Sequence, residues 1–296
     1  MKKLTLTIGI PTYYGGESLV KTVESILKFK NVYDFNIIVS VDGKKLDKQI
    51  YNPLKKYGVR IVENITRGGQ VARINQIISM CETDIIILTQ DDIIFTSSTV
   101  DEIMNGFENN PEVTMEAARV VPLKATNLIE KIIQVGVSIS FTLGKNWNNG
   151  DNYFAAGGRC LAFRTDFAKH FKTPDEVLNS DTYLYFLNQK LGGKFLYVPS
   201  AIYRMRSPNK LSDHLKQSKK YQYVPREIMH YLKIDINKTQ TLPKSLLIYA
   251  TLKEFSKNPI ITFIYWIIMF YTRIKEKGMY DNVTRFWDTD ISTKKI

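Results

Sequence analysis

Acidic residues occur at three places in the chain where a carboxylate could bind a metal ion, accept a proton or accept hydrogen bonds from a nucleoside. Asp91 and Asp92 follow an apolar run at residues 85–88, and adjacent carboxylates at a strand end can hold Mg²⁺ or Mn²⁺, which take oxygen ligands. Asp181 opens a segment of helical character, where a carboxylate could act as general base for a hydroxyl group. Asp42 ends another apolar run and could accept hydrogen bonds from a nucleobase or a ribose.

Each of these residues also has a purely structural interpretation. Asp is common in turns, which would account for Asp91, Asp92 and the Asp42 turn. The helix dipole favours an Asp in the first turn of a helix, which would account for Asp181. The residue types alone therefore leave both interpretations open, and the choice depends on whether the fold brings these carboxylates together.

Arginines offer a second kind of chemistry. Arg204 and Arg206 follow a late strand-like segment, and the planar fork of a guanidinium suits a diphosphate, although both side chains could equally face solvent. Arg73 lies on a helical segment after a Gly68-Gly69 pair. Taken alone, Arg73 fits a surface or packing role.

The elements that must position these residues alternate between strand and helix in the first half of the chain. Apolar residues at helical spacing predict helices near residues 19–27, 71–78 and 100–107. Alternating or continuous apolar residues predict strands at 4–10, 35–41, 59–62 and 84–89. This β-α-β-α-β order predicts a parallel sheet with right-handed crossovers. Further along, strands are predicted at 113–123, 159–163 and from 195, a helix at 182–191, and a loop rich in Gly and Asn at 149–159.

The predicted sheet places polar residues from three strands at one edge. Ligands of such sheets bind at the carboxyl ends of the strands, near a switch in strand order. Thr12 and Tyr13, Asp42, and the Gln90-Asp91-Asp92 stretch follow the predicted strand ends. We therefore expect these side chains to converge on one crevice.

Composition and charge limit the classes of partner. The chain has 296 residues, and its 41 Lys and Arg against 29 Asp and Glu give a formal charge of +12. Such a surplus favours anionic partners such as anionic lipid or phosphorylated substrates. Because no arginine-rich tail or RNA-binding signature occurs, we expect no nucleic-acid partner. Only two cysteines and no continuous apolar leader favour a cytoplasmic location.

The C-terminal part has a different composition. Residues 258–272 carry no charge and are almost all apolar, yet they are short of the about 20 residues that span a bilayer. Basic residues flank them, which suits a helix lying in the interface of an anionic membrane. A buried helix or an oligomer contact is the alternative. We therefore divide the chain into a catalytic domain, residues 1–225, and a helical, membrane-associating segment, residues 226–296, at the inner face of the membrane.

Taken together, these motifs resemble those of the family 2 glycosyltransferases, which have the GT-A fold. The resemblance covers about residues 4–206. It depends on the order and spacing of five segments: the opening strand with its nucleotide-contact loop, the second strand ending in Asp, the glycine-rich turn with the helix after it, the strand with the metal motif, and the segment with the catalytic acidic pair. In this sequence they are Ile8–Tyr13, Ile37–Gly43, Gly68–Asn75, Ile86–Ile93 and Ser180–Leu184.

The resemblance implies an α/β fold with a mostly parallel central sheet flanked by helices, and a metal-dependent, inverting transfer of a sugar. The expected donor is a nucleotide-sugar, with UDP as the expected nucleotide. The expected acceptor is a hydroxyl of a glycan or a lipid-linked molecule, as in polysaccharide biosynthesis. Mg²⁺ or Mn²⁺ would lie at Asp91, with Asp92 secondary, and Asp181 would be the base. The residues expected to contact the donor are Pro11, Thr12, Tyr13, Asp42, Arg73, Gln90, Arg204 and Arg206.

The sequence departs from the family pattern at three points. Thr89 stands where the first carboxylate of the metal motif often lies, Ser180 replaces the usual Glu before Asp181, and Tyr203 occupies the neighbourhood of a frequent His. These departures concern the diphosphate contacts more than the reaction. Two other functions stay open: a nucleotidyltransferase, and a membrane-associated protein that binds nucleotide-sugars without turnover.

Overall fold

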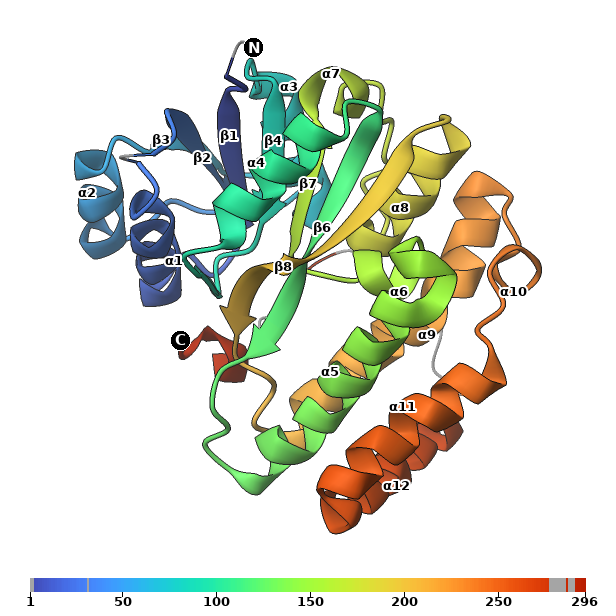
Figure 1. Ribbon diagram of the computed structural model, residues 1–296. Helices are drawn as coiled ribbons and strands as arrows, with labels where there is room; N and C mark the ends of the chain where they lie inside the picture. The colour runs from blue at the N-terminus through green and yellow to red at the C-terminus, as the bar shows by residue number, and fades with distance from the viewer. Residues whose placement is uncertain (1–2, 31, 277–285, 287–290) are drawn as a thin grey trace.

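The computed structural model describes residues 3–30, 32–276, 286 and 291–296. In this part of the chain the strands form one sheet of eight, in the order β3-β2-β1-β4-β7-β6-β8-β5 (Figure 1). The strands are β1 (Leu6–Thr12), β2 (Phe35–Asp42), β3 (Arg60–Asn64), β4 (Ile85–Thr89), β5 (Ile93–Phe95), β6 (Val113–Pro122), β7 (Cys160–Arg164) and β8 (Lys194–Met205).

The sheet is mixed, with its parallel part at the N-terminal half of the chain. β3, β2, β1 and β4 are parallel neighbours, as the alternation of strands and helices predicted. β7 then pairs antiparallel with β4 and with β6, whereas β6 and β8 are parallel to one another. The short β5 is antiparallel to β8 at the sheet edge. The expectation of a mostly parallel sheet is confirmed in this mixed form.

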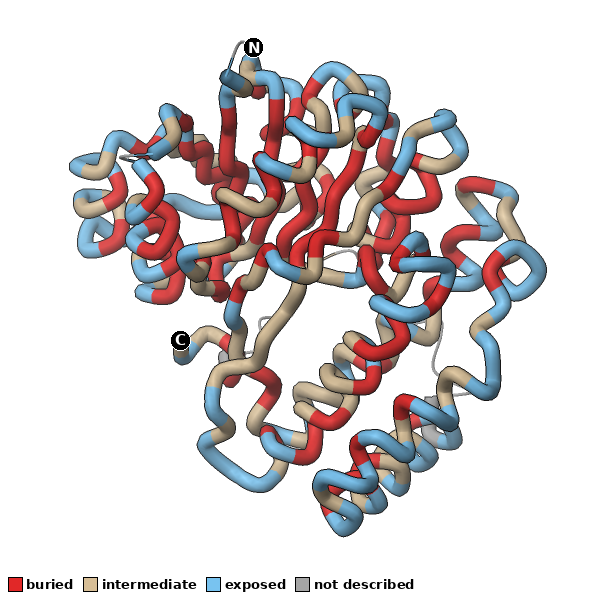
Figure 2. The backbone as a smooth tube through the Cα atoms, viewed as in Figure 1, coloured by how far each residue is buried: buried red, intermediate tan, exposed pale blue. Residues whose placement is uncertain are grey.

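Helices cover both faces of the sheet and create a three-layer core. α1 (Glu17–Leu27), α2 (Lys48–Lys56) and α4 (Thr99–Asn109) bury their apolar sides against one face. α3 (Gln70–Met80), α8 (Ser180–Lys190) and α9 (Leu211–Leu232) pack on the other face. β4 is buried along its whole length between the two layers, which is why its sequence is a continuous apolar run. Figure 2 shows this as buried strands under helices whose outer sides are exposed.

A third apolar cluster lies apart from the sheet. It joins α5 (Leu128–Asn146) to the helical pair α11 (Lys244–Lys257) and α12 (Pro259–Glu276) through buried side chains such as Ile132, Ile139 and Tyr265. In Figure 1 these three helices occupy the lower part of the view. None of the helices in the described part of the chain is long and apolar enough to cross a bilayer.

The predicted division after residue 225 falls inside a continuous helix. α9 runs through this point, and Ile228, Leu232 and Ile236 beyond it pack into the same core as α3 and α8. The helices that pack apart from the sheet at the C-terminal side begin with α11. Apolar contact with the sheet layers therefore extends past residue 225.

Two shorter helical segments replace the loop predicted at 149–159. A 3-10 turn, η1 (Trp147–Gly150), and a helix, α6 (Tyr153–Ala156), occupy most of it. Asn148 and Asn149 adopt positive φ, which Asn tolerates better than most residues. The Asn152 side chain accepts from the N–H of Ala155 at 3.0 Å and caps α6. The prediction of a loop was wrong here because the same Asn residues support turns and helix caps.

Candidate active site

The carboxyl ends of β1, β2 and β4 meet at one edge of the sheet because these strands are parallel neighbours. Thr12 ends β1, Asp42 ends β2, and Asp91 follows β4. β7 runs antiparallel to β4 and begins opposite Thr89, so Arg159 joins the group from the same edge. The topology thus collects residues from four strands.

Asp91 is buried, and its two carboxylate oxygens have different partners. The Thr12 hydroxyl donates to Oδ2, and the N–H of Gly15 donates to the Thr12 hydroxyl at 3.0 Å. The ammonium of Lys294 donates to Oδ1. The loop after β1 therefore orients one oxygen of Asp91, while the other oxygen faces a cation.

Asp92 is also buried and is enclosed by donors. Nη1 of Arg159 lies 2.9 Å from both carboxylate oxygens, and the Arg159 carbonyl accepts from the Thr89 hydroxyl at 3.0 Å. Nζ of Lys294 lies 3.2 Å from Oδ2, and the Thr293 hydroxyl donates to the same oxygen at 3.0 Å. Burial alone would raise the pKa of Asp92, but the Arg159 and Lys294 cations hold it well below its usual range.

Asp42 organises the turn before α3. Its carboxylate accepts from the backbone N–H groups of Gly68 at 2.8 Å and Gly69 at 3.2 Å, and Nε of Arg73 lies 3.2 Å from Oδ1. Gly69 has φ +88°, a conformation that favours glycine. Asp42 therefore has a structural role in the glycine turn, and its nucleobase contact stays a prediction.

Aromatic and basic groups gather beside Asp42. The guanidinium of Arg67 lies 4.0 Å from the centroid of the Tyr13 ring, within the range of a cation–π contact. Nε of Arg67 is also 3.9 Å from Oδ2 of Asp42. This arrangement places a positive charge and a flat aromatic face next to one another, which suits a base joined to phosphates.

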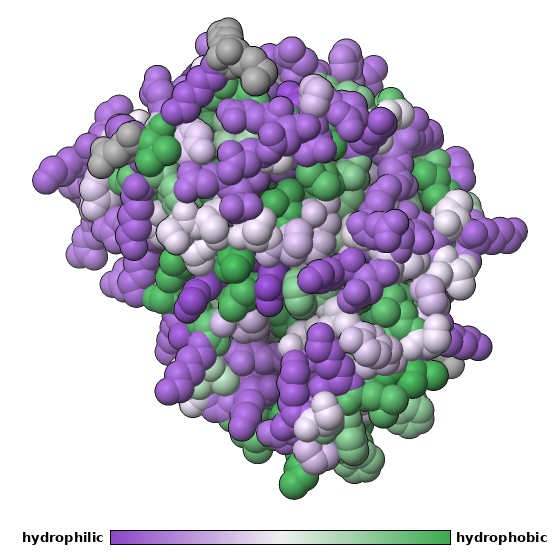
Figure 3. Space-filling model, viewed as in Figure 1, coloured by the Kyte–Doolittle hydropathy of each residue, from purple (hydrophilic) through white to green (hydrophobic). Residues whose placement is uncertain are grey.

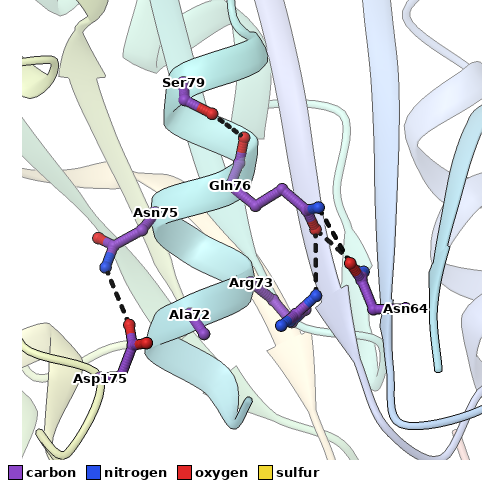
Figure 4. A pocket seen from close by; sticks show the side chains of 7 residues that line it. All are labelled: Asn64, Ala72, Arg73, Asn75, Gln76, Ser79 and Asp175. Atoms are coloured by element: carbon purple, nitrogen blue, oxygen red, sulfur yellow. Dashed lines mark hydrogen bonds between the residues drawn. The ribbon is translucent and has the colours of Figure 1, made fainter. Parts of the chain in front are cut away.

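A cavity of about 470 Å³ adjoins this region along α3 (Figure 4). The amides of Asn64 and Gln76 exchange hydrogen bonds at 3.0 Å, which connects β3 to α3. Figure 4 shows Asn75 turned the other way, toward Asp175, with an N–O distance of 3.3 Å. The cavity wall is thus polar on both sides, and its lining residues are Asn64, Ala72, Arg73, Asn75, Gln76, Ser79 and Asp175.

Asp181 lies in the first turn of α8, where the sequence predicted a helix start. Its Oδ1 accepts from the N–H of Thr182 at 2.8 Å. Burial raises the pKa of Asp181 to about 6, against the lowering effects of the Thr182 N–H and of the Arg159 cation. Because Arg159 also holds Asp92, its guanidinium lies within electrostatic reach of both carboxylates. The structure thus links Asp181 to the group at the strand ends.

The loop before α8 is held from α9 by a buried carboxylate. Glu227 accepts from the N–H groups of Leu178 at 2.6 Å and Asn179 at 3.1 Å. The Asn179 side chain also donates to the carbonyl of Lys220 at 2.9 Å. Burial and the neighbouring Asp181 raise the pKa of Glu227, whereas these N–H donors lower it. Glu227 is therefore a positioning residue for the start of α8.

The remaining residues that were predicted to contact the nucleotide-sugar lie in different environments. Pro11 is buried within β1, and Gln90 is half-buried directly after β4. Arg206 pairs with Glu130 of α5 at 3.0 Å, and its Nε donates to the carbonyl of Lys295. Arg204 is exposed on β8, and alternation along the strand turns it away from the side on which Tyr203 is buried. A diphosphate contact of Arg204 and Arg206 stays a prediction.

The comparisons with known proteins bear on this group of residues. Residues 7–171 match the model of Glycosyl transferase family 2. The chain belongs to this family. It is therefore a nucleotide-sugar-dependent glycosyltransferase of the GT-A type, and the resemblance drawn from the sequence motifs is confirmed. None of the curated proteins matches the chain.

Solved structures share the fold of this family 2 glycosyltransferase at low sequence identity. A mannosyltransferase from Pyrobaculum calidifontis, in complex with GDP-mannose and Mn²⁺, is 12% identical with a TM-score of 0.59, covering 96% of this chain and 89% of that chain. A glucosyl-3-phosphoglycerate synthase from Mycobacterium tuberculosis, in complex with Mn²⁺, UDP-glucose and phosphoglyceric acid, is 12% identical with a TM-score of 0.54, covering 76% and 79%. Both structural neighbours hold a nucleotide-sugar together with Mn²⁺.

The residues at the β4 end fit a divalent cation of the kind that these neighbours hold. Asp91 offers carboxylate oxygens, which are hard ligands suited to Mg²⁺ or Mn²⁺, and the Lys294 ammonium shows that a cation is accepted at Oδ1. Among the described residues, no three His, Cys, Asp or Glu side chains lie close enough to hold a metal ion by themselves. Such ions commonly take one or two carboxylates together with substrate phosphates and water, so a ligand set completed by the donor is consistent with this site.

Three residues of the site were not found from the sequence: Arg159, Glu227 and Lys294. Arg159 lies directly before a predicted strand, a position that would have indicated its place at the sheet edge. Glu227 and Lys294 reach the site from α9 and from the C-terminal segment. Neither position carries a sequence signal that connects it with the strand ends.

Proposed function

We propose that this family 2 glycosyltransferase catalyses a metal-dependent, inverting transfer from a UDP-sugar to a hydroxyl of a glycan or lipid-linked acceptor. The observation that supports it most is that Arg159, which pairs with Asp92 next to Asp91, also lowers the pKa of Asp181. A carboxylate suited to a cation and a carboxylate with a pKa near neutrality then serve the same crevice.

In this proposal the nucleoside lies over the residues that end β1 and β2. Tyr13 and Arg67 present a flat face and a positive charge, and the cavity beside Arg73 offers amide donors and acceptors. The diphosphate lies toward Asp91. A divalent cation held by Asp91 would neutralise the diphosphate and stabilise it as a leaving group.

Asp181 acts as the base. As the acceptor oxygen attacks the anomeric carbon, the bond between that carbon and the diphosphate oxygen breaks on the opposite side, which inverts the configuration. The proton of the acceptor hydroxyl passes to a carboxylate oxygen of Asp181. The pKa of about 6 leaves most of this carboxyl ionised near neutral pH and still basic enough to take a proton.

The variant Asp181→Asn tests the assignment of the base. Removal of a positioned base costs about 10²- to 10⁴-fold in rate, so kcat should fall by that range while UDP affinity stays within about twofold. Asp166→Asn, at an exposed position in the short helix α7 (Thr165–Ala168), is the control and should leave kcat unchanged. Turnover of Asp181→Asn at the wild-type level would contradict the assignment, and a product with the anomeric configuration of the donor would contradict inversion.

The family assignment favours sugar transfer over nucleotidyl transfer and over binding without turnover. A nucleotidyltransferase would release pyrophosphate from a nucleoside triphosphate and a sugar phosphate. We expect no pyrophosphate under those conditions, and release of free UDP from a UDP-sugar. A screen of UDP- and GDP-sugars by thermal shift, with and without Mn²⁺, tests the choice of nucleotide.

We also propose that α11 and α12 attach the enzyme to an anionic membrane surface at the cytoplasmic side. Part of α12 packs on α5 through Ile261 and Tyr265, but a second set of large apolar side chains on this pair is exposed. Figure 3 shows apolar surface at the lower edge of the molecule, where Figure 1 places the two helices. Basic residues accompany the exposed set, which suits an interfacial position. The exposed set is Ile248, Tyr249, Leu252, Phe255, Ile260, Phe263, Ile267, Phe270, Tyr271 and Ile274.

A further inference from the structure

The C-terminal segment of the chain returns to the active site. Residues 291–296 lie at the carboxyl edge of the sheet (Figure 1), and they contact Asp91 and Asp92, more than 200 residues earlier in the chain. The Ser292 hydroxyl donates to Asp213 at 2.6 Å, and Nζ of Lys21 donates to the backbone oxygen of Ile296 at 2.6 Å. Arg206 donates to the carbonyl of Lys295. The segment is therefore fixed at both ends and in its middle; we refer to residues 292–296 as the tail.

The tail places a cation on the carboxylates of the site. The Lys294 ammonium contacts Oδ1 of Asp91 and lies 3.2 Å from Oδ2 of Asp92, so it bridges the two. The side chain of Lys294 is only 15% exposed, which means that the tail shields this contact from water. Burial alone would lower the pKa of Lys294, but Asp91 and Asp92 raise it, which keeps the ammonium charged.

The tail also lies along the loop that follows β1. A cavity of about 530 Å³ is bounded on one side by Tyr14, Gly16 and Lys21 and on the other by residues 294–296. The same loop orients Asp91 through Thr12. A tail in this position therefore lies against both the carboxylate that would bind the cation and the loop beside the proposed nucleotide.

We propose that the tail is an intramolecular competitor of the metal–nucleotide complex, with Lys294 standing in for the metal ion. This inference rests on the proposed function, because it requires a divalent cation at Asp91. An ammonium at Oδ1 of Asp91 repels a metal ion on the same oxygen and takes the space that the ion would occupy. The tail-bound state and the donor-bound state therefore exclude one another, and the enzyme is held inactive until metal and donor displace the tail.

The fraction of molecules with the tail bound determines how much the tail weakens metal–nucleotide binding. When the competent state has a small population, the apparent dissociation constant rises by the inverse of that fraction. A tail that is bound in about nine molecules of ten weakens metal–nucleotide binding about tenfold. Loss of the Lys294 contact should recover that factor.

The first test measures Mn²⁺ binding in the full-length protein by the loss of the free-ion EPR signal, without and with UDP. Lys294→Ala should tighten Mn²⁺ binding in the presence of UDP by about tenfold. Lys295→Ala is the matched control, because Lys295 has the same charge on the neighbouring residue and an exposed side chain. Unchanged or weaker Mn²⁺ binding by Lys294→Ala would overturn the proposal, and weaker UDP binding would instead make Lys294 a ligand of the diphosphate.

The second test follows the tail directly and separates competition from a simple change of charge. The two native cysteines, Cys81 and Cys160, are buried, so a fluorophore on the variant Lys295→Cys reports on the tail. Saturation with Mn²⁺ and UDP should lower the fluorescence anisotropy, and the background variant Asp91→Asn should show no change. Constant anisotropy at saturation would overturn the tail proposal while leaving the proposed function intact. Absence of Mn²⁺ binding in every variant, with UDP present, would overturn both.

Discussion

Nη1 of Arg159 lies 2.9 Å from both carboxylate oxygens of Asp92. The pair joins the start of β7 to the end of β4, and it neutralises one of the two carboxylates that follow β4. Asp92 is thereby paired with Arg159, whereas Oδ1 of Asp91 faces the Lys294 ammonium. The pair also brings a fixed positive charge within electrostatic reach of Asp181.

Replacement of Arg159 should therefore change the titration of Asp181 as well as the rate. Arg159→Met removes a cation that lowers the pKa of Asp181, so the acid limb of the kcat–pH profile should move to higher pH. Turnover should fall at least about tenfold, because the fixed positive charge near Asp181 is lost. Arg159→Lys keeps the charge and should keep the acid limb near its wild-type position. A loss of rate with an unmoved limb in Arg159→Met would contradict this role and leave a structural one.

The pH dependence of the wild-type enzyme follows from Asp181. Only the ionised carboxylate can accept the proton, so kcat should rise with pH through about 6 and reach a plateau above it. Below that value the rate should fall about tenfold per pH unit. The measurement is kcat for sugar transfer between pH 4.5 and 8 at saturating donor and metal. A rate that is constant from pH 5 to 8 would mean that another group takes the proton.

The parallel half of the fold was predictable because its signals are local. The apolar run at residues 85–88 and the helical spacing between the strands place Thr12, Asp42 and Asp91 at one edge without long-range knowledge. The antiparallel strand β7 and the tail were not predictable in the same way. Arg159 and Lys294 reach Asp92 across 67 and 202 residues of sequence, and such pairs leave no periodic pattern. The exposed and buried sides of α12 were also left open, since both are apolar.

Glu116 is a buried acid outside the active site, and its protonation should make the stability of the folded protein depend on pH. Glu116 on β6 is fully buried, its two oxygens have no hydrogen-bond partner in the described part of the chain, and Gly106 of α4 leaves the space that it fills. Burial raises the pKa of Glu116 to about 9, against the lowering effect of Arg164. Because the pKa in the folded state is above that of the unfolded chain, the folded protein binds the proton more tightly. The resulting stability is full below about pH 4.5 and is lost as the pH rises toward 9.

The variant Glu116→Gln keeps the shape and removes the ionisation. Between pH 6 and 9 its advantage over the wild-type protein in free energy of unfolding should grow by about 4 kcal/mol. Glu112→Gln, at an exposed position on the preceding turn, is the control and should show no such trend. Denaturant unfolding at several pH values measures this. Equal pH slopes for Glu116→Gln and the wild-type protein would show that Glu116 is not protonated in the folded state.

If α11 and α12 attach the protein to a membrane, polar substitutions among their exposed apolar side chains should weaken vesicle binding. Phe263→Ser with Phe270→Ser should lower the partition onto anionic vesicles at least about tenfold, because each buried aromatic side chain contributes about 1.5–3 kcal/mol. Ile65→Ser is the matched control, since Ile65 is 67% exposed and Phe270 is 68% exposed, but Ile65 lies outside the helical pair. Vesicle sedimentation measures the partition. Equal sedimentation of the double variant and the wild-type protein would place the membrane contact elsewhere or exclude it.

The central claim is that the donor diphosphate and a divalent cation meet at Asp91, in the crevice that Asp181 serves. A crystal structure of the protein with Mn²⁺ and UDP, recorded at a wavelength where manganese scatters anomalously, tests it most directly. We expect an anomalous peak at about 2.0–2.5 Å from a carboxylate oxygen of Asp91, with the UDP phosphates on the same ion and Lys294 away from that oxygen. UDP and manganese bound at a surface that excludes Asp91 would contradict the account.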